Sequence, residues 1–175
     1  SITKKYTGYI NRPDSLLVDY TTHILNLASY VNFECSPARN LRLVGSLRYD
    51  AFTYRFNNHL PVSAVSGSPD TTSSFSQVSP KIGFTYNFKK NRGFYFNYSR
   101  GFVPPQVSEL FRSVKVPNLD PSTFDNLEWG AWAQLIKDKL VAEIAVYRLQ
   151  GKNSIISVKF DDGTFGNANA GGTLH

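Results

Sequence analysis

Apolar and polar residues alternate with a period of two along most of the chain. From His23 onward, one face carries Leu25, Leu27, Val31 and Phe33, and the other carries Asn26, Tyr30, Asn32 and Glu34. Alternation sustained over about ten residues indicates a strand with one apolar face. Residues 1–22 lack this pattern and carry a turn signal at Arg12-Pro13-Asp14, so we expect them to be irregular.

Five further segments alternate in the same way, and the second strand is expected to continue to Phe56. Residues 164–175 are expected to begin a seventh strand. In chain order, the apolar faces of the five segments carry Leu41, Leu43, Leu47 and Tyr49; Ile82, Phe84, Tyr86 and Phe88; Phe94, Phe96 and Tyr98; Leu127, Trp129, Ala131, Ala133 and Leu135; Leu140, Ala142, Ile144 and Val146.

The connections between these strands alternate between short and long. Short turns are expected at 36–40, 89–93 and 138–139, and long connections at 57–74, 103–125 and about 151–163. Short turns at one end and long loops at the other are typical of outer-membrane β-barrels. The expected strand lengths, about nine to twelve residues, also match the length that a tilted strand needs to cross a bilayer. A soluble antiparallel sandwich is the alternative, and the loop asymmetry favours the barrel.

Aromatic residues toward the strand ends fit the interfacial girdles of such barrels. The residues expected to form these girdles are Tyr49, Phe52, Tyr54, Phe88, Phe94, Tyr98 and Trp129.

In a barrel the apolar face would contact lipid, and the polar face would line the lumen. Charges that are costly in lipid are tolerated in a wet or protein-filled interior. Six or seven strands are too few to close a barrel, and an open edge in lipid leaves backbone groups unsatisfied. We therefore predict an all-β fold in which residues 1–175 form about seven antiparallel, up-and-down transmembrane strands of a larger barrel. The polar face carries Arg42, Arg48, Asp50, Asn87, Asn97, Glu128, Gln134 and Glu143.

Composition supports strands and gives no sign of an enzyme. Of 175 residues, 14% are aromatic and 18% charged, a mixture that favours β-structure. The single cysteine, Cys35, cannot form an internal disulfide. We find no Ser/His/Asp spacing, metal-ligand cluster or phosphate-binding glycine loop, so no catalytic residue, metal or cofactor is expected. The net charge of +6 hints at anionic partners, but the placement of the basic residues on strands fits nucleic-acid binding poorly.

Several short motifs, in order, resemble the TonB-dependent outer-membrane receptors. The resemblance covers roughly residues 41–175. The residues between 103 and 120 contain no histidine, which argues against the haem-uptake members, and Ser122-Thr123 replaces the usual acidic residue. The motifs are Gln77-Val78-Ser79-Pro80-Lys81-Ile82-Gly83-Phe84-Thr85-Tyr86, Tyr98-Ser99-Arg100-Gly101-Phe102-Val103-Pro104-Pro105, Val116-Pro117-Asn118-Leu119-Asp120-Pro121, Asn126-Leu127-Glu128-Trp129-Gly130, and the pair Ala145-Val146-Tyr147 and Asn167-Ala168-Asn169-Ala170-Gly171.

The resemblance implies a 22-stranded barrel in the bacterial outer membrane, filled by a plug domain. The plug would precede residue 1 and the last strands would follow residue 175. Such a receptor imports a scarce ligand, here a ferric siderophore or other iron complex, with energy delivered by TonB. Its other partners would be outer-membrane lipid and lipopolysaccharide. A cobalamin or oligosaccharide receptor of the same family, or a passive porin-like or adhesion barrel, remains an alternative.

Four residues are candidates for contacting an anionic chelate at the outer face: Tyr54, Arg55, Arg112 and Lys115. Tyrosine and arginine combine aromatic and cationic contacts, and lysine adds a point charge.

Two further expectations concern the barrel wall. Gly101 and Pro104-Pro105 should end the fourth strand and bend the chain outward, since proline cannot donate to a ladder. Glu128 is expected to pair with Arg100 or Arg48.

Overall fold

A computed structural model describes residues 2–5, 16–159, 161, 163 and 165–174. Most of the described chain is strand. One antiparallel sheet has the order β1-β2-β3-β4-β5-β6-β7-β10, and β8 and β9 form a separate hairpin. The bounds are β1 Ile2–Lys5, β2 Leu16–Ala38, β3 Leu41–Asn58, β4 Thr71–Lys89, β5 Arg92–Val103, α1 Val107–Phe111, β6 Ser122–Ile136, β7 Leu140–Lys152, β8 Ile155–Lys159, β9 Phe165–Asn169 and β10 Thr173–Leu174.

Five of the six long strands exceed the nine to twelve residues that the alternation predicted, and β5 falls within that range. Strands β2, β3 and β4 have 23, 18 and 19 residues, whereas β5, β6 and β7 have 12, 15 and 13. The prediction that residues 1–22 are irregular was wrong for β1 and for the start of β2, which pair from Ile2 with Tyr20 to Lys5 with Leu16. The predicted turn at Arg12-Pro13-Asp14 lies outside the described residues.

The expected seventh strand also needs correction. Phe165–Asn169 pairs with β8, not with the main sheet. Only Thr173 and Leu174 continue the main sheet, by pairing with Gly151 and Gln150 of β7. The sheet ends at β1 and β10, so it remains open, as expected for part of a larger barrel.

The strand register brings the six apolar stripes onto one face of the sheet. Directly paired residues in adjacent strands share a face. One such row runs through Leu43, Phe84, Phe96, Trp129 and Val146. The neighbouring row, through Asn97 and Glu128, lies on the opposite, polar face. We call these the lipid face and the lumen face.

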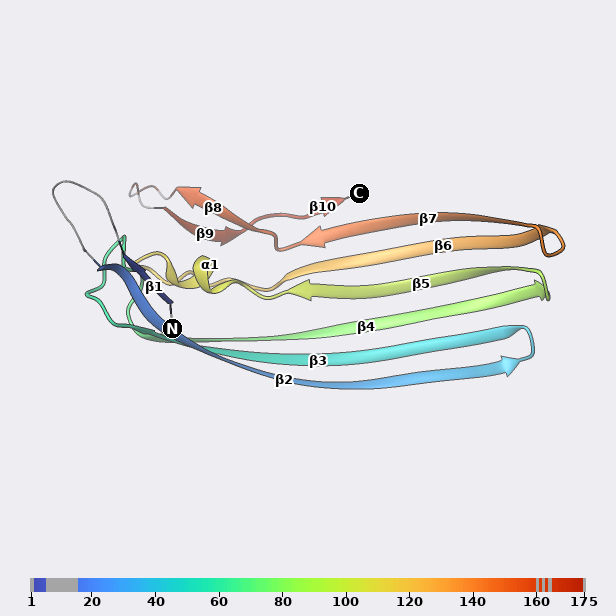
Figure 1. Ribbon diagram of the computed structural model, residues 1–175, viewed down its shortest axis with the longest axis horizontal. Helices are drawn as coiled ribbons and strands as arrows, with labels where there is room; N and C mark the ends of the chain where they lie inside the picture. Colours follow the sequence, from blue (N-terminus) through green and yellow to red (C-terminus); the bar gives the residue numbers. More distant parts are fainter. Residues whose placement is uncertain (1, 6–15, 160, 162, 164, 175) are drawn as a thin grey trace.

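The two ends of the sheet differ, as predicted (Figure 1). At one end lie the short turns that join β2 to β3, β4 to β5 and β6 to β7. In the last of these Asp138 adopts a positive φ of 57°. At the other end lie the connections 59–70, 104–121 and 153–172. Short periplasmic turns and long extracellular loops distinguish the two ends of outer-membrane barrels, so the loop end is the outer end.

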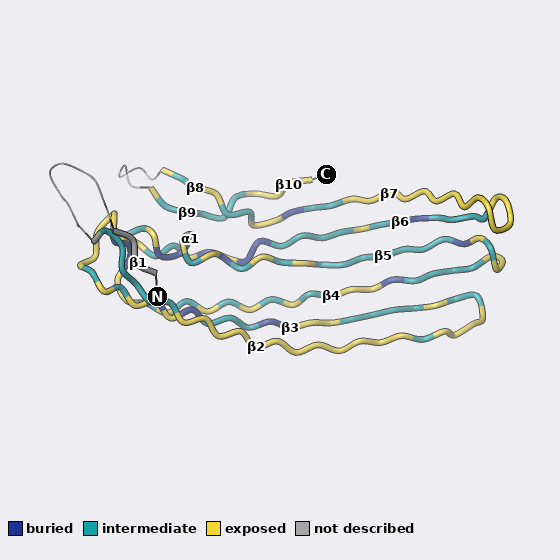
Figure 2. The backbone as a smooth tube through the Cα atoms, viewed as in Figure 1, coloured by how far each residue is buried: buried dark blue, intermediate teal, exposed yellow. Residues whose placement is uncertain are grey.

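The buried hydrophobic core of the described chain lies at the outer end. The buried positions farther along the strands in Figure 2 are glycines and Asp50. A cluster formed by Tyr54, Phe56, Leu110, Phe111 and Leu119 is at most 5% exposed. In contrast, large apolar residues along β2 and β7 are exposed. We call this the roof cluster, and the three long connections the roof.

One part of the predicted aromatic girdle was wrong. Phe52 and Tyr54 pair with Asn26 and Ile24, and their even positions place them on the lumen face with Asp50. Both pack in or against the roof cluster. The prediction failed because a strand residue near the membrane boundary can face either side.

Candidate ligand-binding site

The roof folds back over the lumen face at the outer end of β3. Phe111 of α1 stacks on Phe56 of β3, with ring centroids 4.6 Å apart and planes 17° apart. Tyr20 of β2 lies 4.9 Å from the Phe56 ring. The strand end at Val103, just before Pro104-Pro105, was predicted correctly. The outward bend was not: the chain turns inward, because Leu110 and Phe111 are buried against lumen-facing residues.

A main-chain hydrogen bond joins two roof segments. The amide of Ser68, in the connection between β3 and β4, donates to the Phe111 carbonyl at 3.0 Å. Gly67 makes this approach possible, because it has a φ of +100° and a Cβ there would lie 2.5 Å from the Phe111 carbonyl oxygen. A side chain at this position would therefore push the loop away from α1.

Asparagine side chains join the other roof segments. The Asn169 side chain accepts from the Asp120 amide at 2.7 Å and donates to the Asp120 carbonyl at 2.9 Å. The Asn167 amide group donates to the Glu109 carbonyl at 2.8 Å. Two of the motifs noted in the sequence, around Asp120 and Asn169, therefore meet in space. Asparagine suits position 169 because its side-chain amide can both donate to and accept from the backbone at Asp120, which has no neighbouring strand to pair with.

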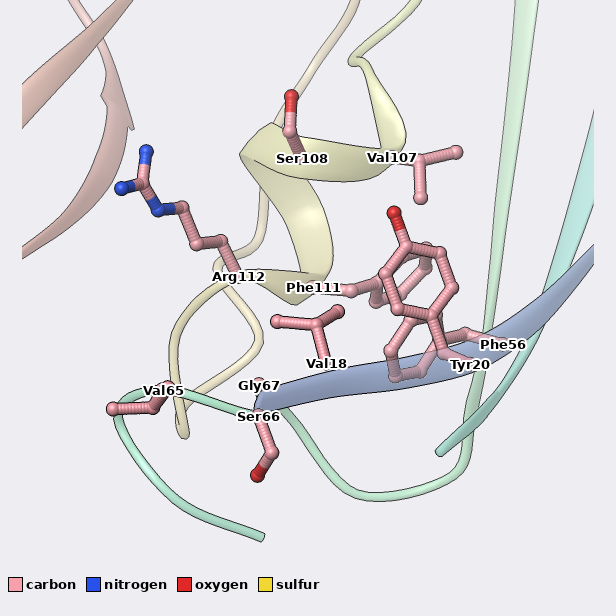
Figure 3. Close-up of a pocket in the computed structure, with 10 residues that line it drawn as sticks. All are labelled: Val18, Tyr20, Phe56, Val65, Ser66, Gly67, Val107, Ser108, Phe111 and Arg112. Atoms are coloured by element: carbon pink, nitrogen blue, oxygen red, sulfur yellow. The ribbon is translucent and has the colours of Figure 1, made fainter. Parts of the chain in front are cut away.

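A cavity of about 300 Å³ opens between α1, the outer end of β2 and the β3–β4 connection. Figure 3 shows the rings of Tyr20, Phe56 and Phe111 gathered on one side, with the Arg112 side chain extended on the other. The cavity therefore combines an aromatic wall with one cation. It is lined by Val18, Tyr20, Phe56, Val65, Ser66, Gly67, Val107, Ser108, Phe111 and Arg112.

The four candidate residues are not brought to one point. Arg112 lines the cavity, and Tyr54 belongs to the roof cluster. Arg55 is exposed and pairs with His23, so it projects from the opposite face to Tyr54. Lys115 is exposed on the connection that follows α1 and does not line the cavity.

On the lumen face, nearer the inner end than the roof, Tyr95 of β5 reaches across to the neighbouring strand β6. The Tyr95 hydroxyl donates to Glu128 at 2.8 Å. The Tyr95 ring lies so close over Gly130 that no Cβ could fit there. The Glu128 and Gly130 positions of the fifth-strand motif therefore both serve Tyr95.

The predicted pairing of Glu128 with Arg100 or Arg48 was wrong. Arg48 donates to Asp50 at 2.7 and 2.8 Å. Arg100 lies opposite Asp125, on the lipid face, and so cannot reach a lumen-facing carboxylate. Knowing the register would have excluded it.

The Asp125 carboxylate lies just beyond the apolar stripe of β6 and has several hydrogen-bond and ion-pair partners. Its carboxylate accepts from Arg100 at 2.7 and 3.1 Å and from the Tyr98 hydroxyl at 2.8 Å. Lys152 lies 3.4 Å away. This polar cluster marks the outer limit of the lipid face.

No helix within the described ranges is long and apolar enough to cross a membrane. In the same ranges no group of three or more His, Cys, Asp or Glu residues is arranged to hold a metal ion.

Sequence reasoning missed most of the cavity. A signal for α1 was present: Glu109 follows Gln106 by three residues, and its carboxylate accepts from the Gln106 amide at 2.7 Å, as in a capping box. No local signal indicated that Phe111 would stack on Phe56, 55 positions earlier in the numbering.

Comparison with known proteins points to one family. Residues 3–174 match the family model described as TonB dependent receptor-like, beta-barrel. No curated protein sequence matches the chain.

Solved structures support the same fold. The ferric-catecholate import receptor Fiu from E. coli K12 is 22% identical, with a TM-score of 0.62 over 85% of this chain and 24% of that one. The copper transporter OprC is 19% identical, with a TM-score of 0.66 over 90% and 25%. The siderophore receptor PiuA from Acinetobacter baumannii is 18% identical, with a TM-score of 0.64 over 93% and 23%. The chain thus spans about a quarter of the length of each of these proteins.

Proposed function

The chain belongs to the β-barrel family of TonB-dependent receptors, and on that premise we propose that the complete protein imports a ferric siderophore or another iron complex. The chain is part of a barrel of the bacterial outer membrane. The proposal extends this to a barrel of 22 strands closed around a plug domain, a strand number that is compatible with a plugged lumen. TonB would supply the energy through the plug.

The observation that carries the proposal is the cavity under the roof. It lies on the lumen side at the outer end of the barrel, where an incoming ligand arrives. Tyr20, the partly exposed ring of the aromatic wall, offers aromatic surface, and the Arg112 guanidinium offers a planar cation. This combination suits an anionic chelate with flat, partly apolar groups. Lys115, exposed nearby in sequence, adds positive charge to the approach.

The known receptors support this ligand class without fixing it. Fiu and PiuA are named for ferric catecholates and siderophores, whereas OprC is named for copper.

We propose testing uptake and growth on defined iron sources in a strain whose only receptor of this kind is the complete protein. Growth on one ferric siderophore that is lost when TonB or the plug is removed would support the proposal. Growth that persists without TonB would instead favour a passive pore. No iron phenotype would turn attention to cobalamin and then to oligosaccharides.

The role of the cavity is tested separately by Arg112→Gln, with Arg148→Gln as the matched control on the lipid face of β7. We expect Arg112→Gln to weaken ligand binding by about tenfold, the loss of one charge-assisted hydrogen bond. Equal ligand affinity of the two variants would show that the ligand does not bind in the cavity. That result would not contradict the proposed transport, which the uptake experiment tests.

A further inference from the structure

The short turns at the inner end of the sheet are strongly basic. The three turns, at 39–40, 89–92 and 137–139, lie at the same end of the sheet (Figure 1). Each of them carries at least one exposed cation. One carboxylate, Asp138, lies among them. The cations of this basic inner rim are Arg39, Lys89, Lys90, Arg92, Lys137 and Lys139.

These cations are not used by the protein itself. In the part of the chain that the structure describes, no ion pair joins any of the six to a carboxylate. The outer end differs: there Arg100 and Lys152 both contact Asp125. Exposed cations outside these ion pairs also occur toward the outer end, as at Arg55 and Arg148, but on the described strands and turns the inner end gathers six of them at one level.

An aromatic cluster on the lipid face adjoins this rim. The rings of Tyr86, Phe88 and Phe94 lie 5.3 to 5.6 Å from one another. Phe88 is 62% exposed and immediately precedes Lys89. Aromatic residues of membrane proteins settle at the level of the lipid headgroups. The cations of the β4–β5 turn are thus placed where the phosphates of the inner leaflet begin.

We propose that the basic inner rim binds the headgroups of anionic phospholipids in the periplasmic leaflet of the outer membrane. Lys89, Lys90 and Arg92 present three charges within four positions, and the turns at 39–40 and 137–139 extend this positive surface along the rim. Phosphate oxygens supply the acceptors that ammonium and guanidinium groups lack here. The lipid is chosen by charge and position, and the interaction does not depend on which ligand the receptor imports.

Fluorescence quenching of the complete receptor in lipid vesicles tests this. The vesicles contain phosphatidylethanolamine and phosphatidylglycerol at fixed proportions, with bromine on the chains of one lipid or the other. The reporter is the fluorescence of Trp129, which is 54% exposed on the lipid face. The contribution of Trp129 is obtained by subtracting the fluorescence of a Trp129→Phe variant. We expect brominated phosphatidylglycerol to quench more than brominated phosphatidylethanolamine at equal mole fraction, and the preference to fall with added salt.

In the variant Lys89→Gln/Lys90→Gln, the preference for phosphatidylglycerol over phosphatidylethanolamine should fall on the order of fivefold for each charge removed, at low ionic strength. Lys89→Arg/Lys90→Arg keeps the charge and should keep the preference. Arg148→Gln/Lys159→Gln, which removes two exposed cations from the outer half, should leave it unchanged. Equal quenching by both lipids, or the same loss in the outer-half control, would overturn the proposal and leave the rim as a solvated surface.

Discussion

Phe111 in the roof and Val146 in β7 are both large apolar residues, yet Phe111 is 2% exposed and Val146 is 69% exposed. The roof is surrounded by water and must bury its apolar side chains against one another. The strands β2–β7 face lipid, so their apolar side chains need no protein partner on that side. Apolar residues of the same kinds therefore form a packed core in the roof and a lipid-facing surface on strands β2–β7, which we call the wall.

Backbone hydrogen bonding differs between the two regions in the same way. The strands satisfy their amides and carbonyls in continuous ladders. Among the described residues of the roof, strand pairing is limited to the short β8–β9 ladder and the isolated bridge between Ser63 and Gly67. The roof relies as well on side chains such as Asn167 and Asn169. A roof held by individual contacts can be altered piece by piece, whereas the wall behaves as a unit.

The largest effect should come from removing the ring at the centre of the roof. Phe111→Ala leaves a cavity against Phe56 and should cost about 3–5 kcal/mol of local stability. Hydrogen exchange of amides 104–121 in the complete receptor measures this. Val146→Ala is the matched control, because that side chain packs against lipid. If both variants exchange alike, the roof is not the packed region.

A charge on the lipid face should have the next largest effect. Ile144→Arg places a cation in the apolar stripe of β7 and should cost about 2–4 kcal/mol near the bilayer midplane. Val141→Arg, on the lumen face of the same strand, should cost far less. Urea unfolding of the complete receptor in vesicles compares the two. Equal costs would mean that the two faces of β7 have been assigned to the wrong environments.

The asparagine that joins two roof segments should matter less than the buried ring. Asn169→Ala leaves the Asp120 amide and carbonyl without their partner, which should cost about 1–3 kcal/mol. Faster hydrogen exchange in residues 116–121 would report this. The control is Asn118→Ala, an exposed residue of the same loop. An unchanged exchange rate in Asn169→Ala would show that Asp120 is held by other contacts.

The smallest effect concerns the polar cluster at the outer limit of the wall. Asp125→Asn removes the carboxylate that pairs with Arg100 and Lys152. Because such partly exposed ion pairs contribute little, the variant should be less stable than the parent by about 1 kcal/mol.

Denaturation midpoints of the complete receptor at pH 7 provide the measurement. Asp138→Asn in an exposed inner turn serves as the control and should leave the midpoint unchanged. An equal midpoint for Asp125→Asn and the parent would contradict a stabilising role of this cluster.

The wall could be predicted from the sequence because its pattern is local. Period two follows from backbone geometry alone, so Leu127, Trp129 and Ala131 indicate their shared face without any knowledge of neighbours. The pairing of Arg100 with Asp125 could not be predicted, because it depends on register between strands.

The roof escaped prediction for a related reason. Its contacts, such as Asn169 with Asp120, join irregular segments that have no repeating pattern. The placement of Tyr54 and Arg55 on opposite faces could have been predicted from the sequence, since adjacent strand residues point to opposite faces. The cavity beside Arg112 was not, because it depends on how α1 packs against β2 and β3.

The most direct test of the difference between wall and roof is a nitroxide scan in the complete receptor in bilayers, with Cys35 replaced by serine. Single labels at positions 140–148 of β7 and 107–111 of α1 would be probed with oxygen, which concentrates in lipid. Oxygen accessibility should peak at Leu140, Ala142, Ile144 and Val146, fall at the positions between them, and be low throughout α1. A uniform profile along β7, or peaks at the odd positions, would contradict the account.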